Sequence, residues 1–332
     1  MPCTSPRTVG FKADGKTISW SQKEYSKEFA SFQLPCGKCL ECRLAYAREW
    51  AIRCVHEAST YEKNIFLTLT YDDDHLASPR LIYSDVQNFI KKLRKRPYSK
   101  DGQFVHQQED PEPMGFFITG EYGGPPKTLP NGTLSQGFRP HWHIIVFNYE
   151  PNDGVLLYTH ASGDRVQTSA TIDRIWGKGN AEYGPVNKDT AGYCARYAAK
   201  KLVHGKDDDH DFHPISKKSS KYAIGKRWLE QNWKDIFLQG HLLLDDGNKV
   251  PIPRYYEKWL KTHRPADWLC YIQKIKLGRL AEAESKSQSE SEYWWEQYNR
   301  RDPRASTPLT RNQVRRLISE KKFTELQAYL KF

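Results

Sequence analysis

RPHWHIIVFN, residues 139–148, has the apolar, β-branched composition of a buried β-strand and carries two histidines near its start. Side chains two residues apart point to the same face of a strand, so we expect His141 and His143 to lie side by side. Trp142 then points to the opposite face and packs in the core. Paired imidazoles suit a divalent metal ion with open coordination positions. Two surface or core histidines without a ligand are the alternative, because 11 histidines can produce such a pair by chance.

Two other segments also have strand patterns. NIFLTLTYDD (64–73) alternates apolar and polar-leaning positions, and MGFFITGEYGG (114–124) ends in a glycine turn. If 114–121 and 141–148 pair antiparallel, the carboxylate of Glu121 faces the histidines and supplies a third ligand. Imidazole together with carboxylate oxygen suits Mg²⁺ or Mn²⁺. The alternative for Glu121 is a carboxylate in a turn.

Helical periodicity appears at 41–60, 83–96 and 189–203, and segment 166–176 favours a short helix. In the last of the long helices Tyr193 and Tyr197 are four residues apart, hence one turn apart on one face, and Lys200 follows. A phenol is a poor nucleophile at neutral pH because its pKa is about 10, so a nearby cation or a metal-polarised substrate is needed to make it react. Aromatic packing on a core helix is the alternative.

These elements predict an α+β fold with a central antiparallel sheet flanked by helices. We expect three segments: 1–60 with a cysteine cluster and a helix, a core at 61–205, and a basic, Trp-rich, mostly helical region at 206–332. Within this last region KDDDHDFH (206–213) is typical of a linker or exposed loop. Residues 281–301 favour an exposed helix or tether, and 311–331 an amphipathic helix.

The composition favours a polyanionic partner. Lysine and arginine number 51 against 40 acidic residues, giving a net charge of +11, and the excess is largest in 206–332. Aromatic residues make up 13%, which argues against a disordered chain. We expect no membrane span, since no apolar run approaches about 18 residues, and no secretory signal.

Seven cysteines are present, and three of them form the run Cys36-x-x-Cys39-x-x-Cys42. The odd count argues against a disulfide framework. Cys3, Cys54 or His56 could supply a fourth ligand. The spacing favours structural Zn²⁺, with free thiols or an iron–sulfur cluster as alternatives.

In combination, these motifs resemble the HUH endonucleases in their Rep-type order, with histidines before tyrosines. Within that superfamily the chain resembles the replication initiators of gokushoviruses, small single-stranded DNA phages of the Microviridae. The resemblance spans about residues 35–202 and rests on six blocks: PCGKCLECR, WAIR, FLTLTYDD, GEYG, RPHWHIIVFN and GYCARYAAKK. The bulky Trp142 departs from the smaller apolar residue that this family more often has between the histidines.

The resemblance implies a site-specific nickase that starts rolling-circle replication at a viral origin. It implies that His141 and His143 bind the metal, that Glu121 is the acidic ligand, that Tyr193 and Tyr197 are the nucleophiles, and that Lys200 assists them. It leaves open which tyrosine cuts first. The expected partners are single-stranded origin DNA and the host helicase and polymerase, in the host cytoplasm. The alternatives are a non-catalytic, zinc-stabilised nucleic-acid-binding protein and a plasmid or transposon nickase.

Overall fold

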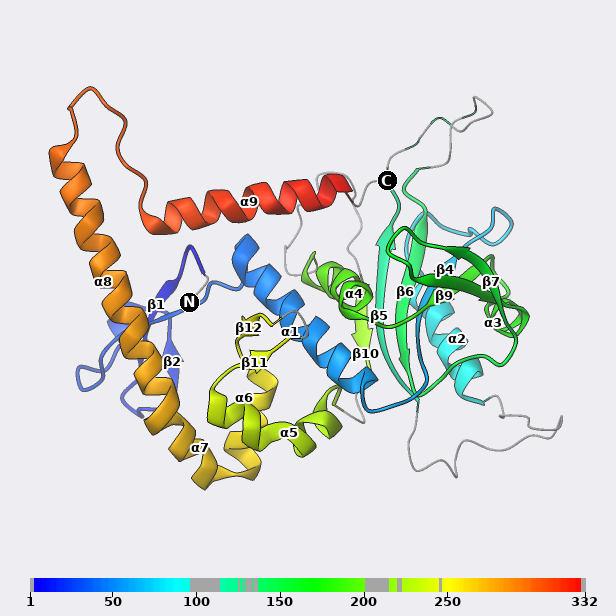
Figure 1. Cartoon of the computed structure of the whole chain (residues 1–332), viewed down its shortest axis with the longest axis horizontal. Coiled ribbons are helices and arrows are strands. Elements are labelled where there is room, and N and C mark those ends of the chain that lie inside the picture. Colours follow the sequence, from blue (N-terminus) through cyan, green and yellow to red (C-terminus); the bar gives the residue numbers. More distant parts are fainter. Residues whose placement is uncertain are drawn as a thin grey trace. The chain divides into compact units, whose positions relative to one another are not determined.

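A computed structural model of the chain describes residues 3–95, 114–124, 126, 128, 133, 137–200, 215–219, 223–244 and 247–329 (Figure 1). It forms two compact units. One comprises Ala47–Trp268, and the other comprises Met1–Tyr46 together with Leu269–Phe332. The three-segment division expected from the sequence stays a prediction.

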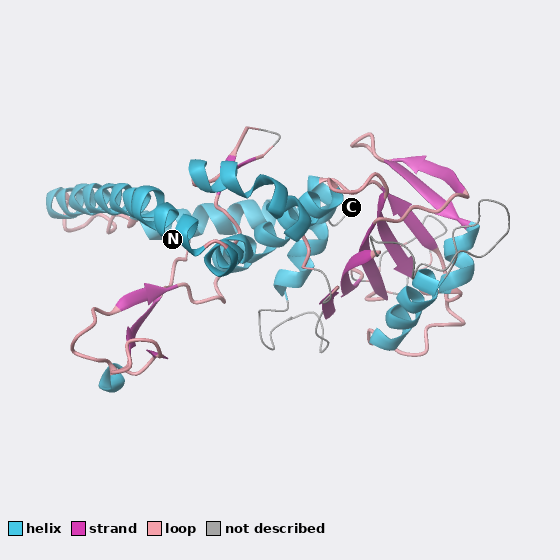
Figure 2. Ribbon diagram, turned by 90° about the horizontal axis from the view of Figure 1, so that it is seen from below, coloured by secondary structure: helices cyan, strands magenta, loops and turns pink. Residues whose placement is uncertain are grey.

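The larger unit is built on a seven-stranded sheet in the order β10-β5-β6-β4-β9-β8-β7, and every adjacent pair is antiparallel (Figure 2, in magenta). The predicted α+β class is therefore confirmed. The strands are β4 (Asn64–Thr70), β5 (Gly115–Tyr122), β6 (Pro140–Phe147), β7 (Gly154–Thr159), β8 (Arg165–Ser169), β9 (Ala181–Gly184) and β10 (Ile215–Lys218).

One face of this sheet carries the main hydrophobic core. Strand β4 alternates strictly, with Ile65, Leu67 and Leu69 buried and the residues between them half-buried. These side chains pack with Trp142, which is fully buried as expected, and with apolar residues of α2 (Tyr83–Lys95) and α3 (Ala170–Trp176). The predicted helix at 83–96 is confirmed over 83–95, and residue 96 lies outside the described residues. Only 170–176 of the predicted short helix is helical, because 165–169 is strand β8.

Helix α4 (Lys188–Lys200) packs against β5, β6 and β10. It lies on the sheet face opposite the core, since Thr119 contacts Cys194 of α4 while the neighbouring Ile118 belongs to the core. Residues 201–203 of the predicted helix, the charged segment 206–213 and most of the loop between Gly123 and Gly137 lie outside the described residues. The face that carries the two histidines is therefore the face that α4 covers.

Helix α1 (Leu40–Ala58) matches the helix predicted at 41–60. In the larger unit, Arg53 donates from Nε to the carbonyl of Ile224 at 3.0 Å, and the imidazole of His56 stacks on Trp228 at 3.5 Å between centroids. Burial lowers the pKa of His56 to about 4. The partners lie in or next to a helical segment with a small hairpin: α5 (Lys226–Gln239), β11 (Leu242–Leu243), β12 (Lys249–Val250), α6 (Arg254–His263) and α7 (Pro265–Tyr271).

The smaller unit has a three-stranded sheet followed, at the other end of the chain, by long helices. Its strands are β1 (Arg7–Phe11), β2 (Ile18–Ser19) and β3 (Phe32–Leu34), with a 3₁₀ turn η1 (Gln22–Glu24). The π-helical turn η3 (Ile272–Lys276) leads into α8 (Leu277–Arg300), and α9 (Arg311–Tyr329) follows. Both predicted C-terminal helices are thus present, the second as far as residue 329, where the described residues end. Among the described residues, none of the helices has the length and apolarity needed to cross a membrane.

Candidate active site

Strand register brings the predicted ligands to one face of the sheet. Glu121 on β5 is directly opposite His141 on β6, and Thr68 on β4 is directly opposite His143. Residues paired in this way share a face. The antiparallel pairing expected between the two segments is confirmed, and it turns the carboxylate of Glu121 toward both imidazoles.

A single carboxylate oxygen joins the predicted residues. Glu121 Oε1 lies 2.8 Å from His141 Nε2, 2.7 Å from His143 Nε2 and 2.9 Å from the hydroxyl of Tyr193, which donates to it. One ligand atom from each of Glu121 and the two histidines lies within 4.8 Å of the others. The other oxygen, Glu121 Oε2, is buried and has no hydrogen-bond partner among the described residues. The group therefore offers two imidazole nitrogens and an unsatisfied carboxylate oxygen to a cation.

The Nδ1 atoms of the two histidines, which are not the atoms that face Glu121, each lie within hydrogen-bond distance of another protein group. His141 Nδ1 lies 3.2 Å from the backbone carbonyl of Arg139, and His143 Nδ1 lies 3.0 Å from the hydroxyl of Thr68. A carbonyl only accepts hydrogen bonds, so Nδ1 of His141 carries a proton and Nε2 is the nitrogen left for a metal ion. Metal-binding histidines commonly have this arrangement.

Charge is unevenly distributed over these three side chains. Burial opposes ionisation of Glu121, but the hydrogen bonds from both imidazoles outweigh burial and lower its pKa to about 2. Burial also disfavours the imidazolium form of His141, yet the hydrogen bond to Glu121 prevails and raises the pKa of His141. For His143 burial prevails and lowers the pKa. A bound cation would replace the protons that now lie between the imidazoles and the carboxylate.

Helix α4 brings Tyr193 to the site because the side chains on the sheet-facing side of the helix are small. Ala191, Cys194 and Ala195 are fully buried, and Cys194 Sγ accepts a hydrogen bond from Thr119 at 3.7 Å. Asn187 caps the start of the helix, since its side-chain oxygen accepts from the backbone N–H of Thr190 at 2.9 Å. The small contact residues allow the helix to approach the sheet closely, which places the Tyr193 hydroxyl on Glu121.

Tyr193 contacts the predicted His143 and two residues that the sequence did not single out, Phe66 and Arg196. Its ring meets the imidazole of His143 edge-on, with centroids 4.9 Å apart, and the ring of Phe66 at 6.2 Å. The guanidinium carbon of Arg196 lies 5.8 Å from the Tyr193 ring centroid. Arg196 follows Tyr193 by three residues on the helix, so helical spacing was the available signal. Phe66 shares its strand face with Thr68.

Tyr197 and Lys200 follow Tyr193 in the same helix. The structure describes their backbone as part of α4, whereas their side chains lie outside the described residues. Their assignment as second nucleophile and assisting cation therefore stays a prediction.

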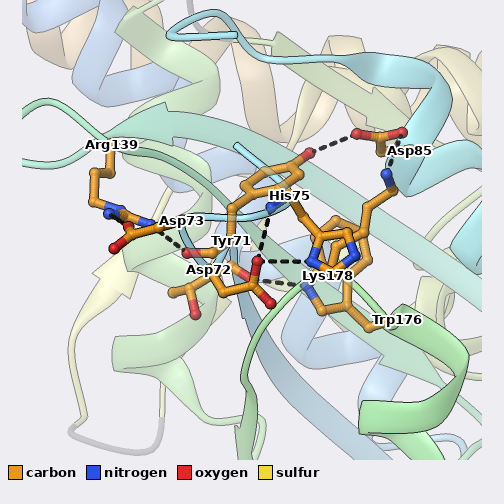
Figure 3. A network of polar contacts seen from close by, with 9 residues as sticks. Tyr71, Asp72, Asp73, His75, Asp85, Arg139, Trp176 and Lys178 are labelled. Atoms are coloured by element: carbon orange, nitrogen blue, oxygen red, sulfur yellow. Dashed lines mark hydrogen bonds and ion pairs between the residues drawn. The ribbon is translucent and has the colours of Figure 1, made fainter. Parts of the chain in front are cut away.

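A network of polar contacts supports the strand ends beside the site (Figure 3). Arg139, just before β6, donates to the backbone carbonyl of Tyr71 at 2.7 Å and forms an ion pair with Asp73. Tyr71 in turn donates to Asp85 of α2 at 3.2 Å, and Trp176 donates to the carbonyl of Thr70 at 2.8 Å. The network fixes the end of β4 against Arg139, whose own carbonyl accepts from His141.

A second group of possible metal ligands lies in the smaller unit. Cys3, Cys36, Cys39 and Cys42 place their sulfur atoms within 4.8 Å of one another. Of the three candidates for the fourth ligand, Cys3 is the one that lies with the other cysteines, and neither Cys54 nor His56 belongs to the group. No described cysteine is in a disulfide.

Comparison with known proteins gives the chain a family. Residues 64–202, which contain the whole Glu121–His–Tyr site, match the family described as "Replication-associated protein ORF2/G2P". This match agrees with the resemblance to phage replication proteins expected from the sequence motifs.

Similar proteins come from three bacterial viruses. The chain is 43% identical to replication-associated protein VP4 of Bdellovibrio phage phiMH2K over the full length of both. It is 30% identical to replication-associated protein ORF2 of Spiroplasma virus 4, covering 84% of this chain and 86% of the relative. It is also 30% identical to replication-associated protein ORF4 of Chlamydia phage 1, covering 71% of this chain and 55% of that protein. No solved structure matches the chain.

Proposed function

Because this chain belongs to the replication-associated protein ORF2/G2P family, we propose that it nicks and rejoins single-stranded DNA at a phage origin through a 5′-phosphotyrosine intermediate. The cut starts rolling-circle replication by leaving a 3′-hydroxyl for a host polymerase. The partners are the single-stranded viral origin and the host helicase and polymerase.

One observation carries the proposal: the hydroxyl of Tyr193 and both imidazole Nε2 atoms converge on Glu121 Oε1. These residues come from β5, β6 and α4 and are up to 72 residues apart in the chain. Aromatic packing alone does not require a tyrosine hydroxyl to meet a buried carboxylate shared by two histidines. A nucleophile beside a cation site is the arrangement that phosphoryl transfer to a phenol needs.

The donor set fits Mg²⁺ or Mn²⁺ held by Glu121, His141 and His143. Glu121 Oε2 is buried without a partner among the described residues, and both Nε2 atoms face the carboxylate. Three protein ligands leave coordination positions open. When bound, the ion supplies positive charge that neutralises the scissile phosphate.

Tyr193 is the proposed nucleophile. Its oxygen attacks phosphorus, the bond from phosphorus to the 3′-oxygen breaks, and the phenol loses its proton to solvent while the departing 3′-oxygen gains one. Glu121, whose pKa is about 2, is a weak proton acceptor, so it orients the phenol rather than keeping its proton. Arg196, beside the Tyr193 ring, provides positive charge that favours the phenolate.

Tyr197 and Lys200 complete the proposed reaction cycle. The spacing of four residues in α4 predicts that Tyr197 shares a helix face with Tyr193. A second tyrosine allows the next strand to be cut while the first is still attached, so that the displaced strand is rejoined as a circle. Lys200 is proposed to contact phosphate or lower a phenol pKa.

A labelled origin oligonucleotide, Mn²⁺ and a denaturing gel test this function. We expect wild type to nick the oligonucleotide, and the double variant Tyr193→Phe/Tyr197→Phe to lose nicking while still binding DNA. Tyr158→Phe, which removes an exposed hydroxyl on β7, is the matched control and should nick normally. Nicking by the double variant at the wild-type rate would refute the mechanism, and DNA binding without nicking by wild type would indicate a non-catalytic protein.

A further inference from the structure

We propose that Cys3, Cys36, Cys39 and Cys42 hold one Zn²⁺ ion in a tetrahedral site of four thiolates. This site is separate from the proposed active site in its residues, its ligand chemistry and its role, which is to hold the N-terminal segment 3–46 together. Nothing in the proposal depends on DNA nicking.

The sulfur spacing matches a single metal ion. Zinc–sulfur bonds are about 2.3 Å, so the sulfurs of a tetrahedral site are separated by about 3.8 Å, the edge of that tetrahedron. Cys39 Sγ and Cys3 Sγ are 3.9 Å apart, and all four sulfurs lie within 4.8 Å of one another. This spacing is too long for a disulfide, whose sulfurs lie about 2 Å apart. A cluster of several irons needs more room between its thiolates, because the metal atoms and bridging sulfides lie between them.

The tight turn between Cys36 and Cys39 is built to hold thiolates. The backbone N–H groups of Lys38 and Cys39 point at Cys36 Sγ, at 3.4 and 3.3 Å. Gly37 makes this possible, since its φ of +73° is a left-handed conformation that favours glycine. Backbone N–H groups that donate to sulfur stabilise its negative charge and orient it toward a metal ion.

The remaining ligands come from both ends of the segment. Cys3 is buried, and its sulfur accepts from the backbone N–H of Cys36 at 3.3 Å. Next to it, Thr4 donates to Glu41 in the first turn of α1 at 3.1 Å. Cys42 lies in that same helical turn. The ion would therefore join the start of the chain to the start of α1 and close a loop that contains β1, β2 and β3.

This segment has only a small apolar core of its own. Among the described residues 3–46, Val9 is the only buried apolar side chain besides Cys3. Its strands contain 5, 2 and 3 residues. A segment with so small a core usually needs a disulfide or a metal ion to fold. Structural zinc sites supply that folding energy directly.

Metal content of the purified full-length protein tests the proposal. We expect one zinc per chain by elemental analysis, and loss of that zinc in Cys42→Ser. Cys270→Ser is the matched control, because Cys270 is an exposed cysteine outside the group, and it should keep the zinc. His143→Ala should also keep it, which distinguishes this site from the proposed active site.

A second measurement covers the case in which Cys42→Ser fails to fold. Removing zinc from wild type with a strong chelator should make the cluster thiols reactive toward a thiol reagent and open segment 3–46 to trypsin, while the pattern of tryptic cleavage elsewhere in the chain is unchanged. Iron in place of zinc, zinc lost from His143→Ala but not from Cys42→Ser, or thiols equally reactive before and after chelation would each overturn the proposal.

Discussion

Replacing Thr68 by valine tests how the proposed metal site is held. The hydroxyl of Thr68 lies 3.0 Å from Nδ1 of His143, and this contact fixes the ring so that Nε2 faces Glu121. Valine has nearly the same shape and is equally β-branched, so strand β4 should be unaffected. The change therefore removes one hydrogen bond and little else.

The size of the effect follows from that single contact. Leaving a buried ring nitrogen without its partner costs roughly 1–3 kcal/mol. Loss of an outer hydrogen bond to a metal-binding histidine typically weakens metal binding about 10- to 100-fold, which corresponds to about 1.4–2.7 kcal/mol. The two estimates agree, so we expect Mn²⁺ affinity to fall by one to two orders of magnitude.

Thr70→Val is the matched control. Thr70 lies two residues further along the same strand face and is also half-buried, but its hydroxyl donates to the carbonyl of Asn180 at 3.2 Å. Mn²⁺ binding by titration calorimetry should be near normal in Thr70→Val and weakened in Thr68→Val. Equal losses in both variants, or normal binding in Thr68→Val, would refute the positioning role of Thr68.

Three further predictions concern stability, each measured by chemical denaturation. Trp142→Ala should lower the free energy of unfolding by about 3–5 kcal/mol, since the fully buried Trp142 side chain fills the core beneath the histidines. Between pH 6.5 and 4 the unfolded chain binds a proton at His56 and the folded chain does not, because burial lowers the pKa of His56 to about 4. His56 alone should therefore lower the free energy of unfolding by about 3 kcal/mol over that range. In His56→Phe the free energy of unfolding should fall less over that range. Gly179→Ala should cost at least about 2 kcal/mol, because φ is +143° and a Cβ would collide with the carbonyl of Thr70.

The central strands were predictable because their own side chains specify them. β4 buries every second residue, and β5 and β6 are largely apolar runs that are buried over most of their length. The outer strands have no such signal. β7 is apolar yet exposed along its whole length, and β9 and β10 have four residues each. Such strands are stabilised by backbone pairing with a neighbour, which a single-sequence pattern does not reveal.

The proposed active site also contains residues that their own sequence pattern indicates and residues whose place depends on strand pairing. Glu121, the histidine pair and Tyr193 were singled out by residue type and spacing, and the fold brings them together. Thr68 and Phe66 were missed, because their roles depend on which residue of β4 lies opposite His143. That register is a property of the assembled sheet. Arg139 was missed for a similar reason, since its carbonyl acts on His141 and its side chain only supports the strand ends.

The most direct test of the proposed function is to identify the residue that becomes attached to DNA. Wild type is incubated with an origin oligonucleotide and Mn²⁺, digested with protease and nuclease, and analysed by tandem mass spectrometry. We predict a 5′-phosphorylated nucleotide on the tyrosine at 193 or 197, in a peptide from α4, and no such adduct in Glu121→Ala. An adduct on any residue outside α4, or nicking with no covalent adduct at all, would contradict the account.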